Sequence, residues 1–326
     1  MAEYKHIPVM LREALDFLLL SPGKNIIDCT LGGAGYTVAI AREVGEKGSV
    51  LAIDLDSLAI ENAKKIIKEK ELKNISLVQD NFKNVYQITK KIWPEEQCKK
   101  VDGIVLDLGL SSAQLADRNR GFSFQLDAPL EMLFGNIQYS IDNIQYGTRT
   151  KDIVNTWSEK EIEKIIKEYG EERFARSITK GIVTARKNGN IETTKQLVDI
   201  IAKSVPGIYR NNKKIHFATR TFQAMRIATN DELTSLKSVL LQSMELLSPG
   251  GRLVVISYHS LEDRIVKHFF RNEAKECICP PEIPICNCNH KPSLKIITKK
   301  AILPCSEEIK NNPRARSAKL RVVEKN

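Results

Sequence analysis

Glycines and carboxylates suited to holding a nucleotide are concentrated in one N-terminal stretch. An apolar run ending in Asp28 is followed by a glycine-rich turn, a helical pattern and a second apolar run that closes on Asp54. This order predicts a β-α-β unit. Gly32, Gly33 and Gly35 allow tight backbone turns and close approach of a ligand. Asp54, nineteen residues after Gly35, is expected at the carboxyl end of the second strand, where an acid accepts the hydroxyls of a ribose.

The glycine turn departs from the dinucleotide fingerprint G-x-G-x-x-G, because Gly33-Ala34-Gly35 is followed at the third position by Val38. A pyrophosphate requires the full glycine set at a helix N-terminus. S-adenosylmethionine has no phosphate and needs only a glycine bend and an acid for its ribose. The stretch therefore favours S-adenosylmethionine, and the alternatives are a nicotinamide or flavin nucleotide, or a turn that binds nothing.

Two later strands are expected to end at the same rim. The strand Ile75–Asp80 is followed by Phe82, and the apolar strand Val101–Gly109 carries Asp107 near its end. In open α/β sheets, ligands bind beyond the carboxyl ends of the strands. An aromatic ring at Phe82 could stack on adenine, although a core-filling role is the alternative.

Helical patterns replace the β-α alternation from Ala116 to about Ile215. Capping boxes at Ser158–Glu161 and Thr193–Gln196 each predict the start of an amphipathic helix. The segment Asn136–Gly147 is less regular and is interpreted as a mobile loop or one that becomes ordered on binding.

Strand patterns resume after the helical segment, over Arg252–Tyr258, Leu294–Thr298 and Lys319–Val323. A sheet begun before the insertion and completed after it indicates a single α/β domain into which a second domain is inserted. We therefore expect an α/β domain of residues 1–115 and 216–326, and an inserted helical substrate-recognition domain of residues 116–215.

Composition sets the protein class and the kind of partner. The chain has 326 residues, 42% of them apolar and 28% charged, which is ordinary for a globular protein. No apolar run reaches about 18 residues and the N-terminus lacks a signal-peptide pattern, so a cytosolic location is expected. The net charge of +10 favours a polyanionic partner, although charge alone predicts only non-specific attraction.

Four of the seven cysteines lie close together, as Cys277-x-Cys279 and Cys286-x-Cys288. Cysteines in a cytosolic chain are expected to be thiols or metal ligands rather than disulfides. Four thiolates at this density could hold a structural zinc ion, although C-x-C is tighter than the usual C-x-x-C spacing. Free thiols in a mobile loop are the alternative.

Six long motifs occur at Asp107–Leu115, Arg120–Phe124, Tyr169–Ala175, Ala218–Ile227, Ile256–Lys267 and Asn312–Arg321. Together they resemble the ribosomal RNA small-subunit methyltransferase H family. The resemblance covers nearly the whole chain and implies a Rossmann-like class I methyltransferase sheet with an inserted all-helical domain. It also implies N4-methylation of a decoding-centre cytidine in 16S ribosomal RNA on the small ribosomal subunit, with S-adenosylmethionine as methyl donor. The implied cofactor positions are Ala34, Gly35, Tyr36, Asp54, Phe82, Asp107 and Gln114.

Asp107 is the candidate catalytic residue. An exocyclic cytosine amine is a poor nucleophile, so an acceptor on its N–H must orient the amine and take up the proton as positive charge develops. Asp107 can be that acceptor, with the Leu108 carbonyl as a second one. The competing interpretation makes Asp107 a residue that faces only the cofactor.

Substrate RNA must present the base unpaired or turned out of its stack. Basic side chains are candidates for phosphate contacts, namely Arg173, Arg176, Lys213, Lys214, Arg220, Arg226, Arg314, Arg316, Lys319 and Arg321. His259 lies between Ser257 and Ser260 but no G-x-S-x-G elbow accompanies it, so a structural or substrate-edge role is favoured over hydrolysis.

Two departures from the family pattern bear on activity. The usual Gly-Gly-His turn is Ala34-Gly35-Tyr36 here, and the Pro129–Gly135 segment lacks the arginine and last acid of the family motif. The first change leaves backbone contacts to the cofactor possible. The second suggests an alternative function, a catalytically weakened relative that still binds RNA or the ribosome. The sequence leaves the oligomeric state open, with a homodimer among the possibilities.

Overall fold

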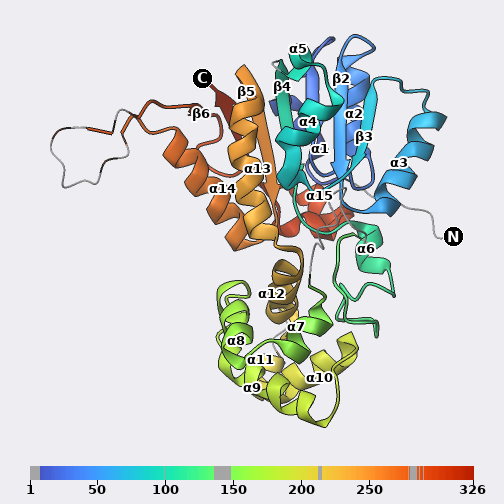
Figure 1. Ribbon diagram of the computed structural model, residues 1–326, viewed down its shortest axis with the longest axis vertical. Coiled ribbons are helices and arrows are strands. Elements are labelled where there is room, and N and C mark those ends of the chain that lie inside the picture. The colour runs from blue at the N-terminus through green and yellow to red at the C-terminus, as the bar shows by residue number, and fades with distance from the viewer. Residues whose placement is uncertain are drawn as a thin grey trace. The chain divides into compact units, whose positions relative to one another are not determined.

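The computed structural model describes residues 8–98, 100–135, 148–211, 215–277, 279, 285, 287, 288 and 290–326. The chain divides into two compact units, one formed by Met1–Gly109 with Leu233–Asn326 and the other by Leu110–Glu232. Colour follows the chain in Figure 1, so the first unit contains both its blue and its red ends.

The first unit is built on a seven-stranded sheet with the order β3-β2-β1-β4-β5-β7-β6. Strands β1 to β5 run parallel, and β7 pairs antiparallel with β5 and β6. The strands are β1 (Asn25–Asp28), β2 (Ser49–Asp54), β3 (Ile75–Gln79), β4 (Val101–Asp107), β5 (Leu247–Ser257), β6 (Leu294–Ile296) and β7 (Lys319–Lys325). The Rossmann-like α/β sheet predicted from the sequence is confirmed, with β5 and β7 longer and β6 shorter than expected.

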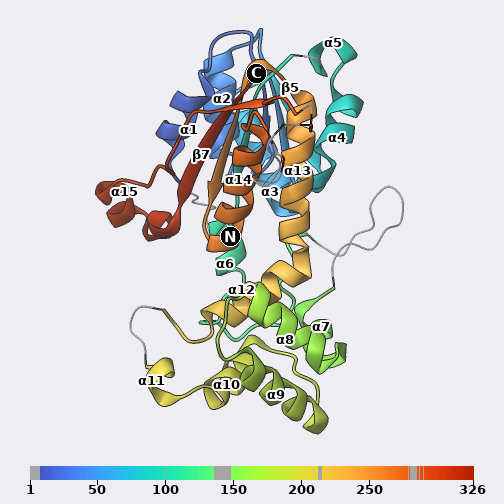
Figure 2. The same cartoon turned by 90° about the vertical axis from the view of Figure 1, so that its left-hand side faces the viewer.

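Helices cover both faces of this sheet because its central strands are apolar on both sides. Ile26 of β1 packs in one core cluster with α1 and α2, whereas its neighbour Ile27 packs in another with α4, α13 and α14. Figure 2 shows α1 and α2 on one side of the sheet and α4 and α13 on the other. The helices are α1 (Leu11–Leu18), α2 (Gly35–Val44), α3 (Ser57–Glu69), α4 (Val85–Ile92), α5 (Glu95–Cys98), α13 (Glu232–Leu246), α14 (Ser260–Glu273) and α15 (Ser306–Asn311), with short 3-10 turns η1 (Phe82–Asn84) and η3 (Pro313–Ser317).

The second unit is helical and has a core of its own. Its elements are α6 (Ser112–Ala116), α7 (Thr150–Thr156), α8 (Glu159–Glu168), α9 (Ala175–Ala185), η2 (Arg186–Asn188), α10 (Thr194–Ser204), α11 (Gly207–Arg210) and α12 (Thr219–Asn230). The capping boxes predicted at Ser158 and Thr193 are both present, at the starts of α8 and α10. Isoleucines of α8, α9 and α10 form the centre of its apolar core.

The second unit extends beyond the expected range 116–215 at both ends. Phe222 and Met225 of α12 belong to the apolar core of the helical unit, which draws that helix into it. The predicted loop Asn136–Gly147 lies outside the described residues. In the part of the chain that is described, no helix is both long and apolar enough to cross a membrane.

Candidate active site

The turn after β1 combines a left-handed backbone with close packing. Gly32 and Ala34 have positive φ values of 47° and 63°, and α2 begins at the next residue, Gly35. A Cβ atom at Gly35 would lie 2.8 Å from the Pro8 Cγ, so only glycine fits there without a shift. The Leu31 amide donates to the Ile53 carbonyl and ties the turn to β2. The most strained residue of the turn is therefore Ala34, not one of the glycines.

Asp54 closes β2 and fixes the same turn. Its Oδ2 accepts a hydrogen bond from the Gly32 amide and its Oδ1 accepts one from the Asp56 amide, both at 2.8 Å. Desolvation raises the pKa of Asp54 to about 6, so the carboxylate is mostly ionised at neutral pH. Each oxygen keeps a lone pair that could accept a ligand hydroxyl.

Asp28 connects the turn to the end of β4. The carboxylate is fully buried and accepts hydrogen bonds from the Thr30 amide at 3.0 Å and the Thr37 hydroxyl at 2.6 Å. The Thr30 hydroxyl in turn accepts from the Asp107 amide at 2.7 Å. Burial raises the pKa of Asp28 to about 6. This chain of bonds fixes the ends of β1 and β4 against each other.

Asp107, the last residue of β4, has one oxygen engaged by a tyrosine. The Tyr258 hydroxyl donates to the Asp107 Oδ1 at 2.6 Å. Desolvation raises the pKa of Asp107 to about 7, and the Tyr258 hydrogen bond opposes this rise. At neutral pH the group is therefore poised between its two protonation states, which suits a proton acceptor.

Phe82 follows β3 at the same edge. The Asp80 amide donates to the Asp54 carbonyl at 3.1 Å and ties the two strand ends together. Phe82 begins η1 and is partly buried against the core cluster that contains Val85 and Ile88 of α4. Its ring therefore has packing contacts, and a contact with adenine stays a prediction.

The remaining cofactor positions have clear local roles. Tyr36, in the first turn of α2, is 3% exposed and donates its hydroxyl to the Val9 carbonyl. Gln114 belongs to the helical unit, where its side-chain oxygen accepts from the Ser111 amide at 2.9 Å and completes the capping box of α6. Ala34, Gly35, Tyr36, Asp54 and Asp107 thus lie at one edge of the first unit, whereas Gln114 lies in the second.

Charge distinguishes this edge. Within the described residues, none of the carboxylates of Asp28, Asp54 and Asp107 forms an ion pair. Carboxylates that are removed from water without a cation are costly, and the raised pKa values of the buried Asp28 and the partly buried Asp54 and Asp107 express that cost. The edge is therefore electrostatically complementary to a positively charged ligand.

Sequence reasoning did not single out Thr30 and Tyr258. Thr30 lies in the expected turn, but nothing in its type indicates that its hydroxyl would bind a distant strand. Tyr258 follows directly after β5, and its position past a strand's carboxyl end was the available signal.

The Pro129–Gly135 segment is held firmly within the helical unit. The Leu130 amide donates to the Glu192 carbonyl at 2.9 Å, and Lys151 forms an ion pair with Glu131 at 2.8 Å. Asn230 donates to the Met132 carbonyl at 2.7 Å. The departures from the family motif therefore leave an ordered segment.

The candidate phosphate contacts differ in how far they are already engaged. Arg226 binds Glu232 through two hydrogen bonds of 2.8 and 2.9 Å, and the Lys319 and Arg321 side chains both bind Asp263. Within the described residues, three other arginines form no ion pair with a carboxylate. Arg173 lies over the rings of Phe174 and Tyr209. Arg220 donates to the Glu171 carbonyl, and Arg176 is exposed. Lys213 and Lys214 lie outside the described residues.

His259 and Ser257 have structural partners. His259 caps α14, because its Nδ1 accepts from the Glu262 amide at 3.4 Å while Glu262 accepts from the His259 amide at 3.2 Å. The Ser257 hydroxyl donates to the Lys319 carbonyl at 3.4 Å. These contacts agree with the structural role favoured from the sequence.

Three of the four clustered cysteines converge. The sulfur atoms of Cys277, Cys279 and Cys288 all lie within 4.8 Å of one another, and the Cys288 and Cys277 sulfurs are 3.8 Å apart. A tetrahedral zinc site with Zn–S bonds of about 2.3 Å has sulfur–sulfur edges of about 3.8 Å. Three thiols therefore fit a zinc ion; the predicted fourth ligand, Cys286, lies outside the described residues.

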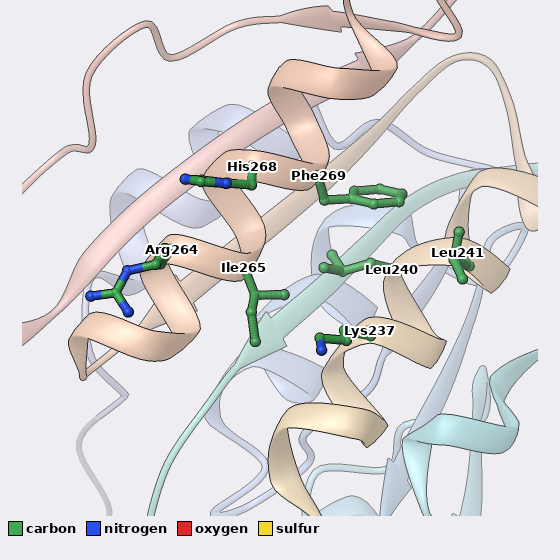
Figure 3. A pocket seen from close by; sticks show the side chains of 7 residues that line it. All are labelled: Lys237, Leu240, Leu241, Arg264, Ile265, His268 and Phe269. Carbon is green, nitrogen blue, oxygen red and sulfur yellow. The ribbon is translucent and has the colours of Figure 1, made fainter. Parts of the chain in front are cut away.

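A separate apolar pocket of about 420 Å³ lies between α13 and α14. Figure 3 shows Ile265 and Phe269 of α14 directed toward Leu240 and Leu241 of α13, with Arg264 on the outer side. None of its lining residues is an expected cofactor or catalytic residue, so the chemistry is not located there.

A sheet of this order, parallel from β1 to β5 with β7 antiparallel, with a glycine bend after β1 and an acid at the end of β2, defines a class I, S-adenosylmethionine-dependent methyltransferase. A model of the MraW methylase family matches residues 3–326. The chain belongs to this family.

Curated relatives match over nearly their whole length. A protein of Finegoldia magna is 44% identical over 323 residues, covering 99% of both chains. Proteins of Dehalococcoides mccartyi and Clostridioides difficile are 47% and 43% identical, covering 100% and 99% of this chain and 88% and 99% of their own. Each is named ribosomal RNA small subunit methyltransferase H.

Proposed function

We propose that this protein transfers a methyl group from S-adenosylmethionine to the N4 amine of a decoding-centre cytidine in 16S ribosomal RNA, on the small ribosomal subunit. The observation that carries the proposal is the strand-end edge with three desolvated carboxylates that lack a cation among the described residues; Asp28 is fully buried, and Asp54 and Asp107 are partly buried. A sulfonium ion supplies that positive charge. The names of the full-length relatives support the RNA substrate.

The donor is expected to bind along the strand ends. Asp54 would accept the ribose hydroxyls, because both of its oxygens are held in place by backbone amides. The turn with left-handed residues at Gly32 and Ala34, just before Gly35, would bring backbone close to the amino-acid end of the donor. Phe82 would line the site and Tyr36, whose side chain is buried, would offer its backbone. The assignment of Gln114 as a cofactor contact stays a prediction.

Asp107 is the proposed acceptor for the amine. S-adenosylmethionine supplies an activated methyl group, whose bond to sulfur breaks as the N4 lone pair forms the new carbon–nitrogen bond. Tyr258 occupies the Asp107 Oδ1, so Oδ2 would accept the N4–H hydrogen bond and then the proton. Orienting the amine in this way can contribute roughly 7–11 kcal/mol of the barrier, mainly through positioning.

RNA binding is assigned to basic side chains that lack a carboxylate partner in the described structure. Arg173 and Arg176 of the helical unit are the best candidates, because Arg226, Lys319 and Arg321 are committed to Glu232 and Asp263. The target base must leave its stack to reach Asp107. We expect the protein to act in the cytoplasm as a monomer or a homodimer.

Transfer to its natural substrate tests the proposal directly. Labelled S-adenosylmethionine is incubated with small subunits that lack the modification, and the product nucleoside is mapped. We expect one N4-methylated cytidine, absent with Asp107→Ala. Binding to subunits without transfer by the unaltered protein would instead support the weakened, binding-only relative that the Pro129–Gly135 departures suggest.

A structural zinc ion is a second, separate proposal, supported by the convergent sulfurs of Cys277, Cys279 and Cys288. Zinc would fix the segment after α14 and need not contact the donor. Metal analysis of protein purified without chelator should find one zinc per chain, lost in the double variant Cys277→Ser with Cys288→Ser. Cys98→Ser is the matched control, because Cys98 lies apart, in α5. Protein without zinc, in which the clustered cysteines all react as free thiols, would rule the site out.

A further inference from the structure

We propose that Tyr258 is a positioning residue for methyl transfer, which holds the Asp107 carboxylate in one orientation and favours its ionised form. The inference rests on the proposed function, because it assigns a role relative to Asp107 as the acceptor. The juxtaposition that carries it is the 2.6 Å hydrogen bond from the Tyr258 hydroxyl to the Asp107 Oδ1.

Strand register brings the two side chains together. Asp107 pairs with Ile256 of β5, and the Leu108 amide donates to the Ile256 carbonyl at 2.9 Å. Tyr258 follows two residues after Ile256, and its amide donates to the Glu262 Oε2 at 2.8 Å. Both the carboxylate and the phenol are therefore carried by backbone that is fixed at several points.

A glycine makes room for the ring. Gly109 has a φ of 109°, and a Cβ atom there would lie 3.1 Å from the Tyr258 Cδ2. The ring thus packs directly against backbone just beyond β4. This close contact restricts the phenol and directs its hydroxyl to Asp107 rather than to solvent.

Tyr258 opposes an otherwise unfavourable environment for a carboxylate. Burial raises the pKa of Asp107 most, and the acids Asp28, Glu262 and Glu308 raise it further. The Tyr36 phenol is also close enough to be influenced by the Asp107 charge, which raises the pKa of Tyr36. Among the described residues, Tyr258 is the only side chain that donates to Asp107. An ionised acceptor at neutral pH therefore depends on the phenol hydroxyl.

The variant Tyr258→Phe removes one oxygen atom and leaves the ring. Without the hydroxyl the pKa of Asp107 rises, so the acid limb of the pH profile of kcat moves to higher pH. A limb displaced by about one pH unit corresponds to about a tenfold loss of rate below the limb and to little loss well above it. Affinity for S-adenosylmethionine, measured by calorimetry above the limb, should stay within about twofold.

Tyr86→Phe is the matched control, because Tyr86 is a partly buried tyrosine of the same unit whose ring packs in a different core. Its pH profile should coincide with that of the unaltered protein. A Tyr258→Phe profile that is unchanged, or lowered equally at every pH, would overturn the positioning role. Full transfer by Asp107→Asn would instead refute Asp107 as the acceptor, which separates failure of the proposed mechanism from failure of this inference.

Discussion

The strand-end acids of the sheet unit and two ion pairs of the helical unit show charge used in opposite ways. At the strand ends of the sheet unit, Asp28, Asp54 and Asp107 are desolvated and have no ion-pair partner among the described residues, and their pKa values are raised. In the helical unit, by contrast, Arg226 pairs with Glu232 and Lys151 with Glu131.

This difference separates charge used for stability from charge kept for a ligand. A paired arginine stabilises the fold and has little left to offer a partner. An acid that is removed from water and has no ion-pair partner destabilises the ligand-free protein. Such an acid marks a place where a bound ligand supplies the missing positive charge. Variants of the charged residues test whether that distinction holds.

The largest effect is expected at Asp107. Asp107→Asn keeps the shape of the side chain but removes the proton acceptor, so transfer should fall by about 10²–10⁴-fold, measured in single-turnover reactions. Asp102→Asn is the matched control, because Asp102 lies on the same strand and accepts from the Asn25 amide at 2.8 Å. Equal losses of transfer in the two variants would show that Asp107 has no specific role in the reaction.

Asp54 should affect donor binding rather than the chemical step. Asp54→Ala removes the acceptor proposed for the ribose hydroxyls and the partner of the Gly32 amide. We expect affinity for S-adenosylmethionine to fall by roughly 10–100-fold, from the loss of hydrogen bonds to a charged group, as measured by calorimetry. Unchanged affinity would show that the donor does not bind at β2.

The unpaired acids should also make stability depend on pH. A carboxyl whose pKa is higher in the folded than in the unfolded protein stabilises the fold at low pH, and this contribution is lost as pH rises through the folded value. The relevant pH window runs from the ordinary aspartate pKa of 3.8 to the raised pKa of Asp107, about 7. Asp107→Asn should therefore raise the free energy of unfolding at pH 8 by roughly 1–3 kcal/mol, measured by urea unfolding without ligand.

Asp263 provides the opposite sign in the same experiment. Its pKa is lowered by the hydrogen bonds from Arg321 and Lys319, although burial raises it. Its contribution is therefore present above pH 3.8 and is lost on further acidification. Asp263→Asn should destabilise the protein at neutral pH, and a stabilising effect there would contradict the distinction between paired and unpaired acids.

A pair of arginines tests the helical unit. Arg226→Gln breaks a bidentate ion pair and should cost roughly 1–3 kcal/mol of stability, because it leaves Glu232 with fewer donors. Arg176→Ala should leave stability unchanged within about 0.5 kcal/mol. It should weaken binding to small subunits and reduce the slope of log K against log salt concentration by about one. Thermal melts and binding at several salt concentrations separate the two effects.

The smallest effect is expected at Ala34, whose φ of 63° is left-handed. Ala34→Gly relieves strain of roughly 1–2 kcal/mol and adds a smaller entropic cost, so a net gain of about 0.5 kcal/mol is expected. Urea unfolding measures the change. Gly48→Ala is the contrasting variant: a Cβ there would lie 2.6 Å from the Lys24 carbonyl, so it should destabilise.

The sequence predicts the sheet well because strands and their ends are local patterns. Apolar runs that end at Asp28, Asp54 and Asp107 can be recognised in the sequence, and the carboxyl ends of parallel strands lie at one edge of a sheet. The limits of the helical unit are harder to recognise. Helix α12 lies in the range 216–326 that the sequence assigned to the α/β domain. It belongs to the helical unit because Phe222 and Met225 pack in that unit's core.

The candidate site was predictable in part. The positions of Asp54 and Asp107 follow from secondary structure, whereas the Thr30 and Tyr258 contacts depend on strand register, which no local pattern encodes. Ala34 is the clearest example of this limit: its type favours right-handed backbone, yet the packing of Gly35 against Pro8 and the bond to β2 hold it in the left-handed region.

The order of the chain also constrains how the protein is made. Strands β4 and β5 are neighbours in the sheet, but all of Leu110–Glu232 is synthesised between them. At 5–20 residues per second, the emerging half-sheet waits roughly 6–25 s with the flank of β4 unpaired. The helical unit, which has its own core, can fold during that interval, so that fewer disordered residues separate β4 from β5 when the two strands pair.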